Sequence, residues 1–164
     1  MKSHGFIKDT DGFYTISRAV NQNDILSAAR EILNRRFKRG TPISNAKASS
    51  EYLISQLSHL EHEVFMLIFL DNSHHIIRSE IMFRGTIDGA SVYPRECVKR
   101  ALALNSAAII MSHNHPSGNN TPSLADKEIT KRISSAMDTV DIRVLDHIIV
   151  AGTQTYSFAE HGLL

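Results

Sequence analysis

The stretch "AAIIMSHNHPSGNNTPSLADKEIT", residues 107–130, passes from an apolar run through two histidines and a polar loop to an acidic residue. The run "AAIIM" is apolar throughout, which is typical of a buried strand. The loop "PSGNNTP" has turn composition, and the segment after it carries Ile129, Ile133 and Met137 at helical spacing. The stretch therefore predicts a strand that runs into His113, a polar turn and a helix.

Two amphipathic helices are expected upstream, at residues 23–37 and 45–61. Their predicted apolar faces consist of Ile25, Ala28, Ala29, Ile32 and Leu33 in the first and Ala48, Tyr52, Leu53, Leu57 and Leu60 in the second. The segment "KRGTPIS" ends the first helix, and both helices need a partner surface. Residues 1–18 mix glycine, aspartate, lysine and aromatic residues without a period, so we expect an extended or poorly ordered arm there.

The middle and the end of the chain contain the remaining strands. "EVFMLIFLD" and "HIIRSEIMFRG" are rich in Val, Ile and Phe, and "DNSH" between them predicts a β-hairpin. "YPRECVKRALALN" predicts a third helix that starts at Pro94, and "IRVLDHIIVAG" predicts a closing strand. The order of elements predicts an α/β (α+β) sandwich in which a mixed β-sheet is flanked by helices.

Length and composition narrow the class of protein. A chain of 164 residues with a formal net charge of +1 suits one domain with a short N-terminal extension, and it lacks the basic excess of many nucleic-acid binders. Cys97 is the single cysteine, so no intrachain disulfide is possible. The N-terminus has no apolar segment of signal-peptide length, and the longest apolar run, Val64–Leu70, is too short to span a bilayer. These features predict a cytoplasmic protein with no membrane segment.

The polar part of the opening stretch has the residue types of a metal site. Residues one apart on a strand point to the same face, so His113 and His115 are expected to present two imidazoles to one point. Asp126, in the first turn of the next helix, supplies a carboxylate. Two histidines and a carboxylate with an open fourth position form the ligand set of catalytic zinc. The alternative interpretation needs no metal, because Ser123 and Asp126 also have the spacing of a capping box.

The same residues resemble a known family. The H-x-H-P-x6-S-x-x-D signature of the JAMM (MPN-type) metalloproteases is matched at His113, His115, Pro116, Ser123 and Asp126. The RadC-like branch is the closer match, and its similarity runs from about Ile25 to Leu164. The resemblance implies a cytidine-deaminase-like, JAMM-type sandwich. It divides the chain into an arm (1–22), a helix with a linker (23–42) and an MPN (JAMM) domain (43–164).

The resemblance also implies roles for individual residues. Zn²⁺ is expected to be held by His113, His115 and Asp126, with a water as the fourth ligand. Ser123 is expected to stabilise the oxyanion of a tetrahedral intermediate. In this family an upstream glutamate at the start of the first long strand hydrogen-bonds the water, and Glu63 matches that place.

Two other glutamates are weaker candidates for the general base. Glu80 lies in the next predicted strand and is the second choice, and Glu61 is the third. A strand-start glutamate such as Glu63 is also a common exposed residue with no catalytic role. The spacing between Glu63 and the motif is long, so the sequence leaves this choice open.

The predicted function is that of a zinc-dependent hydrolase, a metallopeptidase or isopeptidase-like enzyme that acts on an amide bond in a peptide or protein. The alternatives are a non-enzymatic module that binds DNA or protein and a metal-dependent nuclease. Longer members of the family carry a helix-hairpin-helix DNA-binding region, for which this chain has too few residues. The basic run Arg35–Arg39 is a candidate for phosphate contacts or a solvated helix end.

Three further groups of residues are candidates for a role at the site. Asp146 and His147 are adjacent on the last long predicted strand, so they point to opposite faces and at most one can support a zinc-binding histidine. His147 as an ordinary buried histidine is the alternative. Cys97, on the apolar side of a predicted helix, is expected to be a core residue rather than a nucleophile. His74 and His75 lie in a predicted turn, where exposed histidines are common.

Overall fold

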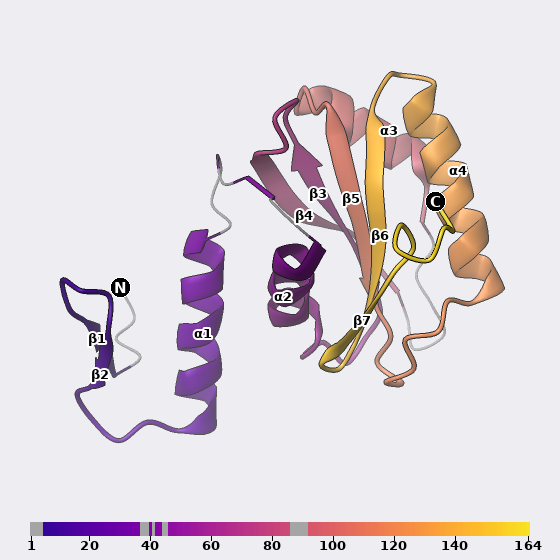
Figure 1. Ribbon diagram of the computed structural model, residues 1–164. Helices are drawn as coiled ribbons and strands as arrows, with labels where there is room; N and C mark the ends of the chain where they lie inside the picture. The colour runs from indigo at the N-terminus through magenta and orange to yellow at the C-terminus, as the bar shows by residue number, and fades with distance from the viewer. Residues whose placement is uncertain (1–4, 37–39, 41, 44–45, 86–91) are drawn as a thin grey trace. The chain divides into compact units, whose positions relative to one another are not determined.

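A computed structural model describes residues 5–36, 40, 42–43, 46–85 and 92–164 (Figure 1). The chain divides into two compact units, Met1–Arg36 and Phe37–Leu164. Within the described residues, no helix combines the length and the apolar character that a membrane crossing requires.

The first unit is a β-hairpin followed by a helix. Strands β1 (Phe6–Lys8) and β2 (Tyr14–Ile16) pair antiparallel, and α1 spans Gln22–Arg36. The carboxylate of Asp9 accepts hydrogen bonds from the backbone N–H groups of Asp11 and Phe13, at 3.0 and 2.8 Å. These bonds organise the turn, as aspartate side chains commonly do. Residues 6–16, expected as part of an extended or poorly ordered arm, therefore form a hairpin.

Helix α1 begins one residue before the predicted span of residues 23–37. The Asn21 side chain accepts from the N–H of Asp24 at 2.9 Å, and the Asp24 carboxylate accepts from the N–H of Asn21 at 3.1 Å, which is a reciprocal cap. Arg18 adds an ion pair with Asp24 at 3.2 Å. On the expected apolar face, Ala28 is buried but Ile25 is 52% exposed. The first unit is small, so its hairpin has too little apolar surface to cover the whole apolar face of α1.

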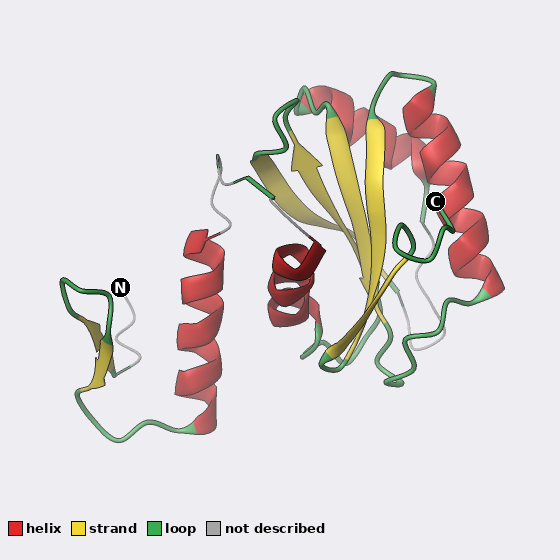
Figure 2. Ribbon diagram, viewed as in Figure 1, coloured by secondary structure: helices red, strands yellow, loops and turns green. Residues whose placement is uncertain are grey.

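The second unit is built on a five-stranded mixed sheet (Figure 2). The strand order is β4-β3-β5-β6-β7; of these four neighbouring pairs, β5–β6 is parallel and the other three are antiparallel. The strands are β3 (Val64–Leu70), β4 (Ile76–Arg84), β5 (Ala108–Asn114), β6 (Arg143–Ala151) and β7 (Gln154–Ser157). The β3–β4 hairpin is confirmed, with the Asp71 carboxylate accepting from the N–H groups of Ser73 and His75 in its turn.

Helices cover both faces of this sheet (Figure 1). Helix α2 (Ala46–Leu57) packs on one face, and α3 (Pro94–Ala103) and α4 (Leu124–Asp138) pack on the other. Every residue of β3 is buried, and its side chains alternate between the two cores, with Met66 and Ile68 toward α2 and Leu67 and Phe69 toward α3 and α4. This two-sided burial explains the continuous apolar run, and the mixed, helix-flanked sheet confirms the predicted fold class.

The central strand β5 extends farther than its apolar run. We expected the strand at residues 107–111, but its pairing continues to His113 opposite Phe65 of β3 and to Asn114 beside Val150 of β6. Because β5 lies between two strands, its backbone groups are hydrogen-bonded on both sides, and polar residues can therefore lie within it. The result is that His113 lies inside the strand and is held by the sheet.

Candidate metal centre

Three predicted ligands meet at the C-terminal end of β5. Ligand atoms of His113, His115 and Asp126 all lie within 4.8 Å of one another. His113 Nε2 is 2.9 Å from His115 Nε2 and 3.2 Å from Asp126 Oδ1, and His115 Nε2 is 3.5 Å from Asp126 Oδ2. Among the described residues, this is the one group of three or more His, Cys, Asp or Glu side chains placed so closely.

The start of α4 holds Asp126 in place. The Ser123 side chain accepts from the N–H of Asp126 at 3.1 Å, and Asp126 Oδ2 accepts from both the N–H and the hydroxyl of Ser123 at 2.7 Å. The capping box suggested by the sequence is therefore present. It engages Oδ2 and leaves Oδ1 directed at His113. The cap and the ligand cluster thus use the same two residues without conflict.

The loop after β5 orients His115. Its Nδ1–H donates to the carbonyl of Asn119 at 2.6 Å, and the backbone turns at Gly118, where φ is +80° and the N–H donates to the His115 carbonyl. A positive φ of this kind favours glycine, which accounts for the "PSG" sequence of the loop. With Nδ1 bound to the loop, the Nε2 atom of His115 faces Asp126.

A buried histidine contacts His113 on the side of its ring away from Asp126. His147 on β6 is fully buried, and its Nε2 lies 2.8 Å from His113 Nδ1, while its Nδ1 lies 2.6 Å from Thr130 Oγ1 on α4. Phe65 lies against both histidine rings, and Phe158 stacks on His147 with ring centroids 4.7 Å apart. Burial holds the pKa of His147 well below its usual value, and the neighbouring His113 adds to that effect.

The candidate ligands change one another's pKa values. Burial raises the pKa of the Asp126 carboxyl, but its contacts with the imidazoles of His113 and His115 outweigh burial, and the pKa lies far below its usual range. The hydrogen bond with Asp126 raises the pKa of His115, and the nearby charge of Glu63 adds to the rise. Asp126 is therefore ionised at neutral pH, which is the form that binds a metal.

The donor set fits zinc. Zinc–nitrogen and zinc–carboxylate bonds of about 2.0–2.1 Å in a tetrahedron separate neighbouring ligand atoms by roughly 3.3 Å. The separations of 2.9, 3.2 and 3.5 Å bracket this value. Two imidazoles and one carboxylate also leave a fourth position for water or substrate, as in catalytic zinc sites. Bound at this point, the ion would be held by His113, His115 and Asp126.

Glu63 precedes β3 at the same end of the sheet. Its carbonyl accepts from the N–H of Gly85 at 2.8 Å, and its side chain is half-buried. Phe65 pairs with His113, so continuing this register by two residues places Glu63 across from His115 and on the same face. The electrostatic effect of Glu63 on His115 agrees with this placement. Glu63 is thus the glutamate that the register brings beside the cluster.

The other two glutamates lie in different surroundings. Glu80 pairs with Leu67 across β3 and β4 and binds Arg100 of α3, with Arg100 Nε 2.7 Å from Glu80 Oε2. It also contacts Arg78 at 2.9 Å. The hydrogen bond from Arg100 holds the pKa of Glu80 below its usual value, against the smaller effect of burial. Glu61 is exposed. Of the three candidates, Glu63 is therefore the one that the strand register brings beside His115.

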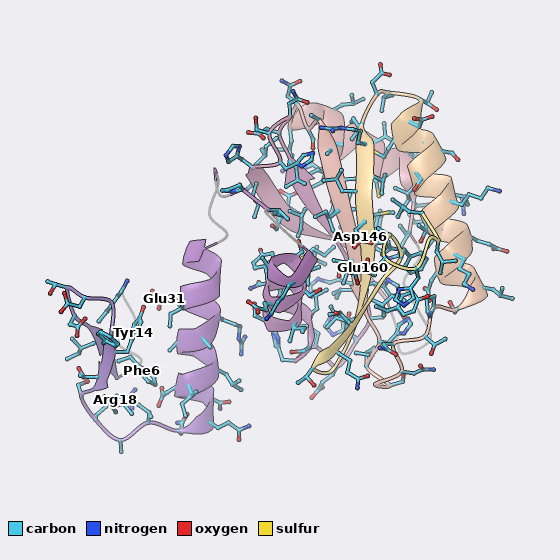
Figure 3. All side chains as sticks on the ribbon, viewed as in Figure 1. Phe6, Tyr14, Arg18, Glu31, Asp146 and Glu160 are labelled. Carbon is cyan, nitrogen blue, oxygen red and sulfur yellow. The ribbon has the colours of Figure 1, made fainter. Side chains whose placement is uncertain are left out.

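Asp146 points away from the cluster, as strand alternation predicts. Its carboxylate accepts from the Ser157 hydroxyl at 2.6 Å and from the N–H of Ala159 at 3.0 Å. Figure 3 shows Asp146 beside the C-terminal turn that carries Glu160. Asp146 therefore holds β7 and the turn after it, and only His147 of this adjacent pair contacts a candidate ligand.

Two other sequence candidates have no part in the cluster. Cys97 lies on α3 and is fully buried in the core, and desolvation raises the pKa of its thiol to about 12, so it is a core residue as predicted. Residues 37–39 of the basic run Arg35–Arg39, and the side chains of Arg35 and Arg36, lie outside what the structure describes. Phosphate binding by this run stays a prediction.

Sequence reasoning missed two supporting residues. Thr130 follows Asp126 by one helical turn, and Asn114, the last residue of β5, separates His113 from His115. Asn114 is buried, accepts from the N–H of Val64 at 2.8 Å and donates to the carbonyls of Leu60 and His62. A polar residue between two candidate ligands was the available signal for Asn114. For Thr130, the signal was a hydroxyl four residues after the acidic ligand.

A hollow lies next to His115. A pocket of about 410 Å³ opens on the α2 side of the strand end, and its lining includes Leu57, Glu61, Asn114, His115, Pro116 and Gly152. His115 belongs to both the pocket wall and the candidate ligand cluster. A group bound in the pocket would therefore be adjacent to the cluster.

Comparisons with known proteins agree with this geometry. Residues 43–163 match the family described as RadC-like JAB domain. A UPF0758 protein from Vibrio cholerae serotype O1 is 48% identical over 151 residues, which cover 92% of this chain and 95% of that relative. A UPF0758 protein from Nitrosococcus oceani is 52% identical over 149 residues, which cover 91% of this chain and 66% of the relative.

Another UPF0758 protein, from Stutzerimonas stutzeri, is 47% identical over 138 residues, which cover 84% of this chain and 62% of the relative. The chain thus spans almost the whole length of the Vibrio relative and less than two thirds of the other two. The names of these relatives state no activity. Both the family match and the similarity over most of the chain lead to one conclusion: this chain belongs to the family of RadC-like JAB domains.

Proposed function

We propose that this chain is a zinc-dependent hydrolase that cleaves an amide or isopeptide-like bond in a peptide or protein substrate. The observation that carries the proposal is the convergence of His113, His115 and Asp126 within 4.8 Å, with Glu63 in register beside them. This set combines a three-ligand zinc site that has an open position with a carboxylate able to move a proton.

Zinc bound at such a site supplies a Lewis acid and lowers the pKa of a coordinated water toward about 7. Glu63 accepts the proton of the attacking water and returns it to the leaving amine. Its half-buried side chain lies at the strand start, opposite His115 when the β3–β5 register is continued. His113 and Asp126, held in the sheet and the capping box, keep the reacting groups in a fixed geometry.

Ser123 is proposed to stabilise the oxyanion. Its hydroxyl donates to Asp126 Oδ2 in the structure. Rotation of this hydroxyl toward a substrate oxygen leaves Asp126 Oδ2 with the hydrogen bond from the Ser123 N–H, at 2.7 Å. Asp126 is therefore still held by the backbone while the hydroxyl acts as a donor to developing negative charge.

The test is a Glu63→Gln variant of the whole chain, with Glu61→Gln as the matched control. Glu63→Gln should retain about one zinc per chain and lose hydrolysis by a factor of about 10²–10⁴, because the amide cannot accept the proton. Glu61→Gln should keep both properties. His113→Ala should lose the zinc, because one of three ligands is gone. Metal content and cleavage of a panel of quenched peptides and isopeptide-linked lysine reporters measure these outcomes.

Different results would support other functions. A wild-type chain that binds no zinc on titration contradicts the proposal. Zinc binding without cleavage of any reporter, together with a salt-sensitive shift of DNA in a gel, favours a binding module. Zinc-dependent cleavage of DNA or RNA, lost in Glu63→Gln, favours a nuclease.

A further inference from the structure

A buried row of hydrogen-bonding groups lies behind the candidate metal centre. It runs from His113 Nδ1 to His147 Nε2, at 2.8 Å, and from His147 Nδ1 to Thr130 Oγ1, at 2.6 Å. Thr130 Oγ1 also binds the backbone carbonyl of Asp126. His113, His147 and Thr130 are each 2% exposed or less, so these bonds are shielded from bulk solvent.

The donor and acceptor roles along this row of hydrogen bonds can be assigned from the chemistry of its groups. The carbonyl of Asp126 can only accept, so the single hydroxyl hydrogen of Thr130 is donated to it. Thr130 Oγ1 must then accept from His147 Nδ1–H. A neutral imidazole carries one N–H, so Nε2 of His147 accepts, and the donor to it is His113 Nδ1–H. In the neutral form of His113, the form that binds a metal, Nε2 is then the unprotonated nitrogen.

The surroundings of His147 favour its neutral form. Phe65 packs edge-on against the His147 ring, with centroids 5.6 Å apart, and Phe158 stacks on it. Full burial among aromatic rings disfavours a charged imidazolium. A doubly protonated His147 would donate to His113 Nδ1. That bond would put the remaining hydrogen of neutral His113 on Nε2, where it would block a metal.

We propose that His147 and Thr130 are positioning residues, which hold His113 in the tautomer whose Nε2 lone pair faces Asp126 and His115. This inference rests on the proposed function for the identity of the metal. The row ends on the backbone of Asp126, so it connects two of the three candidate ligands through side chains that touch neither the metal nor the substrate. Polar partners of this kind orient metal-binding histidines and raise metal affinity.

The test compares Thr130→Val with Thr130→Ser in the full chain. Valine keeps the shape of threonine but cannot accept from His147, so the dissociation constant for Zn²⁺, measured by competition with a chromogenic chelator, should rise by about 10–100-fold. Thr130→Ser keeps the hydroxyl and should retain the wild-type constant. Ser112→Ala is the matched control, because it removes a buried hydroxyl that donates to the Ile148 carbonyl at 2.7 Å on the other face of β5.

A spectroscopic measurement separates positioning from general stability. Imidazole ¹⁵N spectra of the metal-free chain should show His113 with hydrogen on Nδ1 in the wild type and in Thr130→Ser, and a mixture of tautomers in Thr130→Val. If Thr130→Val does not fold, His147→Gln and His147→Leu replace it. The glutamine amide can accept from His113 and should keep most of the zinc affinity, whereas leucine cannot accept and should not.

The outcomes distinguish this inference from the proposed function. Unchanged zinc affinity in Thr130→Val, or a wild-type His113 with hydrogen on Nε2, overturns the positioning role even when the wild type binds zinc and hydrolyses substrate. A wild type that binds no zinc overturns the proposed function, and the ¹⁵N spectra of the metal-free chain still decide the tautomer of His113.

Discussion

At the scale of single residues, Asn114 shows how one amide supports the site from the opposite side of a strand. It lies between His113 and His115 but points away from them, because strand residues alternate. Its oxygen accepts from the N–H of Val64, and its nitrogen donates to the carbonyls of Leu60 and His62. The amide thus holds the chain on both sides of the residue that precedes β3, which is Glu63.

Asn114→Ala should destabilise the fold by about 1–3 kcal/mol, because it leaves the buried N–H of Val64 and the partly buried carbonyls of Leu60 and His62 without their partner. Urea unfolding of the metal-free chain measures this change in the free energy of unfolding. The control is Asn72→Ala, which removes an exposed contact with Arg143 at 3.4 Å and should change the free energy by less than about 0.5 kcal/mol. Equal effects of the two substitutions would contradict this role for Asn114.

At the scale of elements, an ion pair joins an edge strand to a helix. Arg100 of α3 binds both carboxylate oxygens of Glu80 on β4, with Nε–Oε2 and Nη2–Oε1 distances of 2.7 and 2.5 Å. Among the described residues, β4 has a partner strand on one side only, so side-chain contacts with α3 add to its attachment. Both side chains are partly exposed, so solvent screens the pair and its contribution to stability is small.

The contribution of this pair should depend on pH. The hydrogen bond from Arg100 lowers the folded-state pKa of Glu80 below the unfolded value of about 4.3. The stabilisation is therefore present above about pH 4.3 and is lost as the pH falls through the lower, folded-state pKa. The difference in unfolding free energy between wild type and Glu80→Gln should be largest near pH 7 and should shrink below about pH 4.

Chemical denaturation of the metal-free proteins at a series of pH values from 7 to about 3 measures this difference. Glu96→Gln is the control, because the contacts of Glu96 with Arg95 and Lys99 are longer, at 3.7 and 3.6 Å. A difference for Glu80→Gln that stays constant over the whole range would show that Arg100 does not favour the ionised carboxylate. Zinc binding by Glu80→Gln should equal that of the wild type.

At the scale of the whole molecule, both core clusters and all three candidate ligands belong to the unit Phe37–Leu164. The matched family region, residues 43–163, lies inside the same unit. The hairpin and α1 form a separate compact unit with several exposed apolar side chains, among them Phe13 and Ile16. The described contacts of the candidate site therefore do not depend on residues 5–36.

A chain that starts at Phe37 should fold and bind zinc with the affinity of the full chain. Zinc at about 100 times its dissociation constant should raise the free energy of unfolding by about 2.7 kcal/mol in both chains, because binding to the folded state alone stabilises it. Denaturation with and without zinc measures this increase. A shortened chain that folds but binds zinc more weakly would show that the N-terminal unit contributes to the site.

The sequence alone determined the local parts of this protein. Spacing placed His113 and His115 on one face of a strand and Ser123 and Asp126 in one capping box, since each pattern depends on residues at most three apart. The continuous apolar run of β3 likewise indicated a strand that is buried on both faces. The hairpin at residues 6–16 was missed because each of its strands has only three residues, too few to show an alternating pattern. The hairpin depends instead on its turn, at Asp9 and Gly12.

Only the tertiary structure decided which distant residues complete the site. His147 is 34 positions from His113 and lies behind it because β6 pairs with β5 in parallel. Glu63 comes beside His115 through the antiparallel register of β3 and β5. Arg100 holds Glu80 at a different place on the sheet. Strand pairing between distant segments leaves no local pattern in the sequence, because register depends on the packing of whole faces.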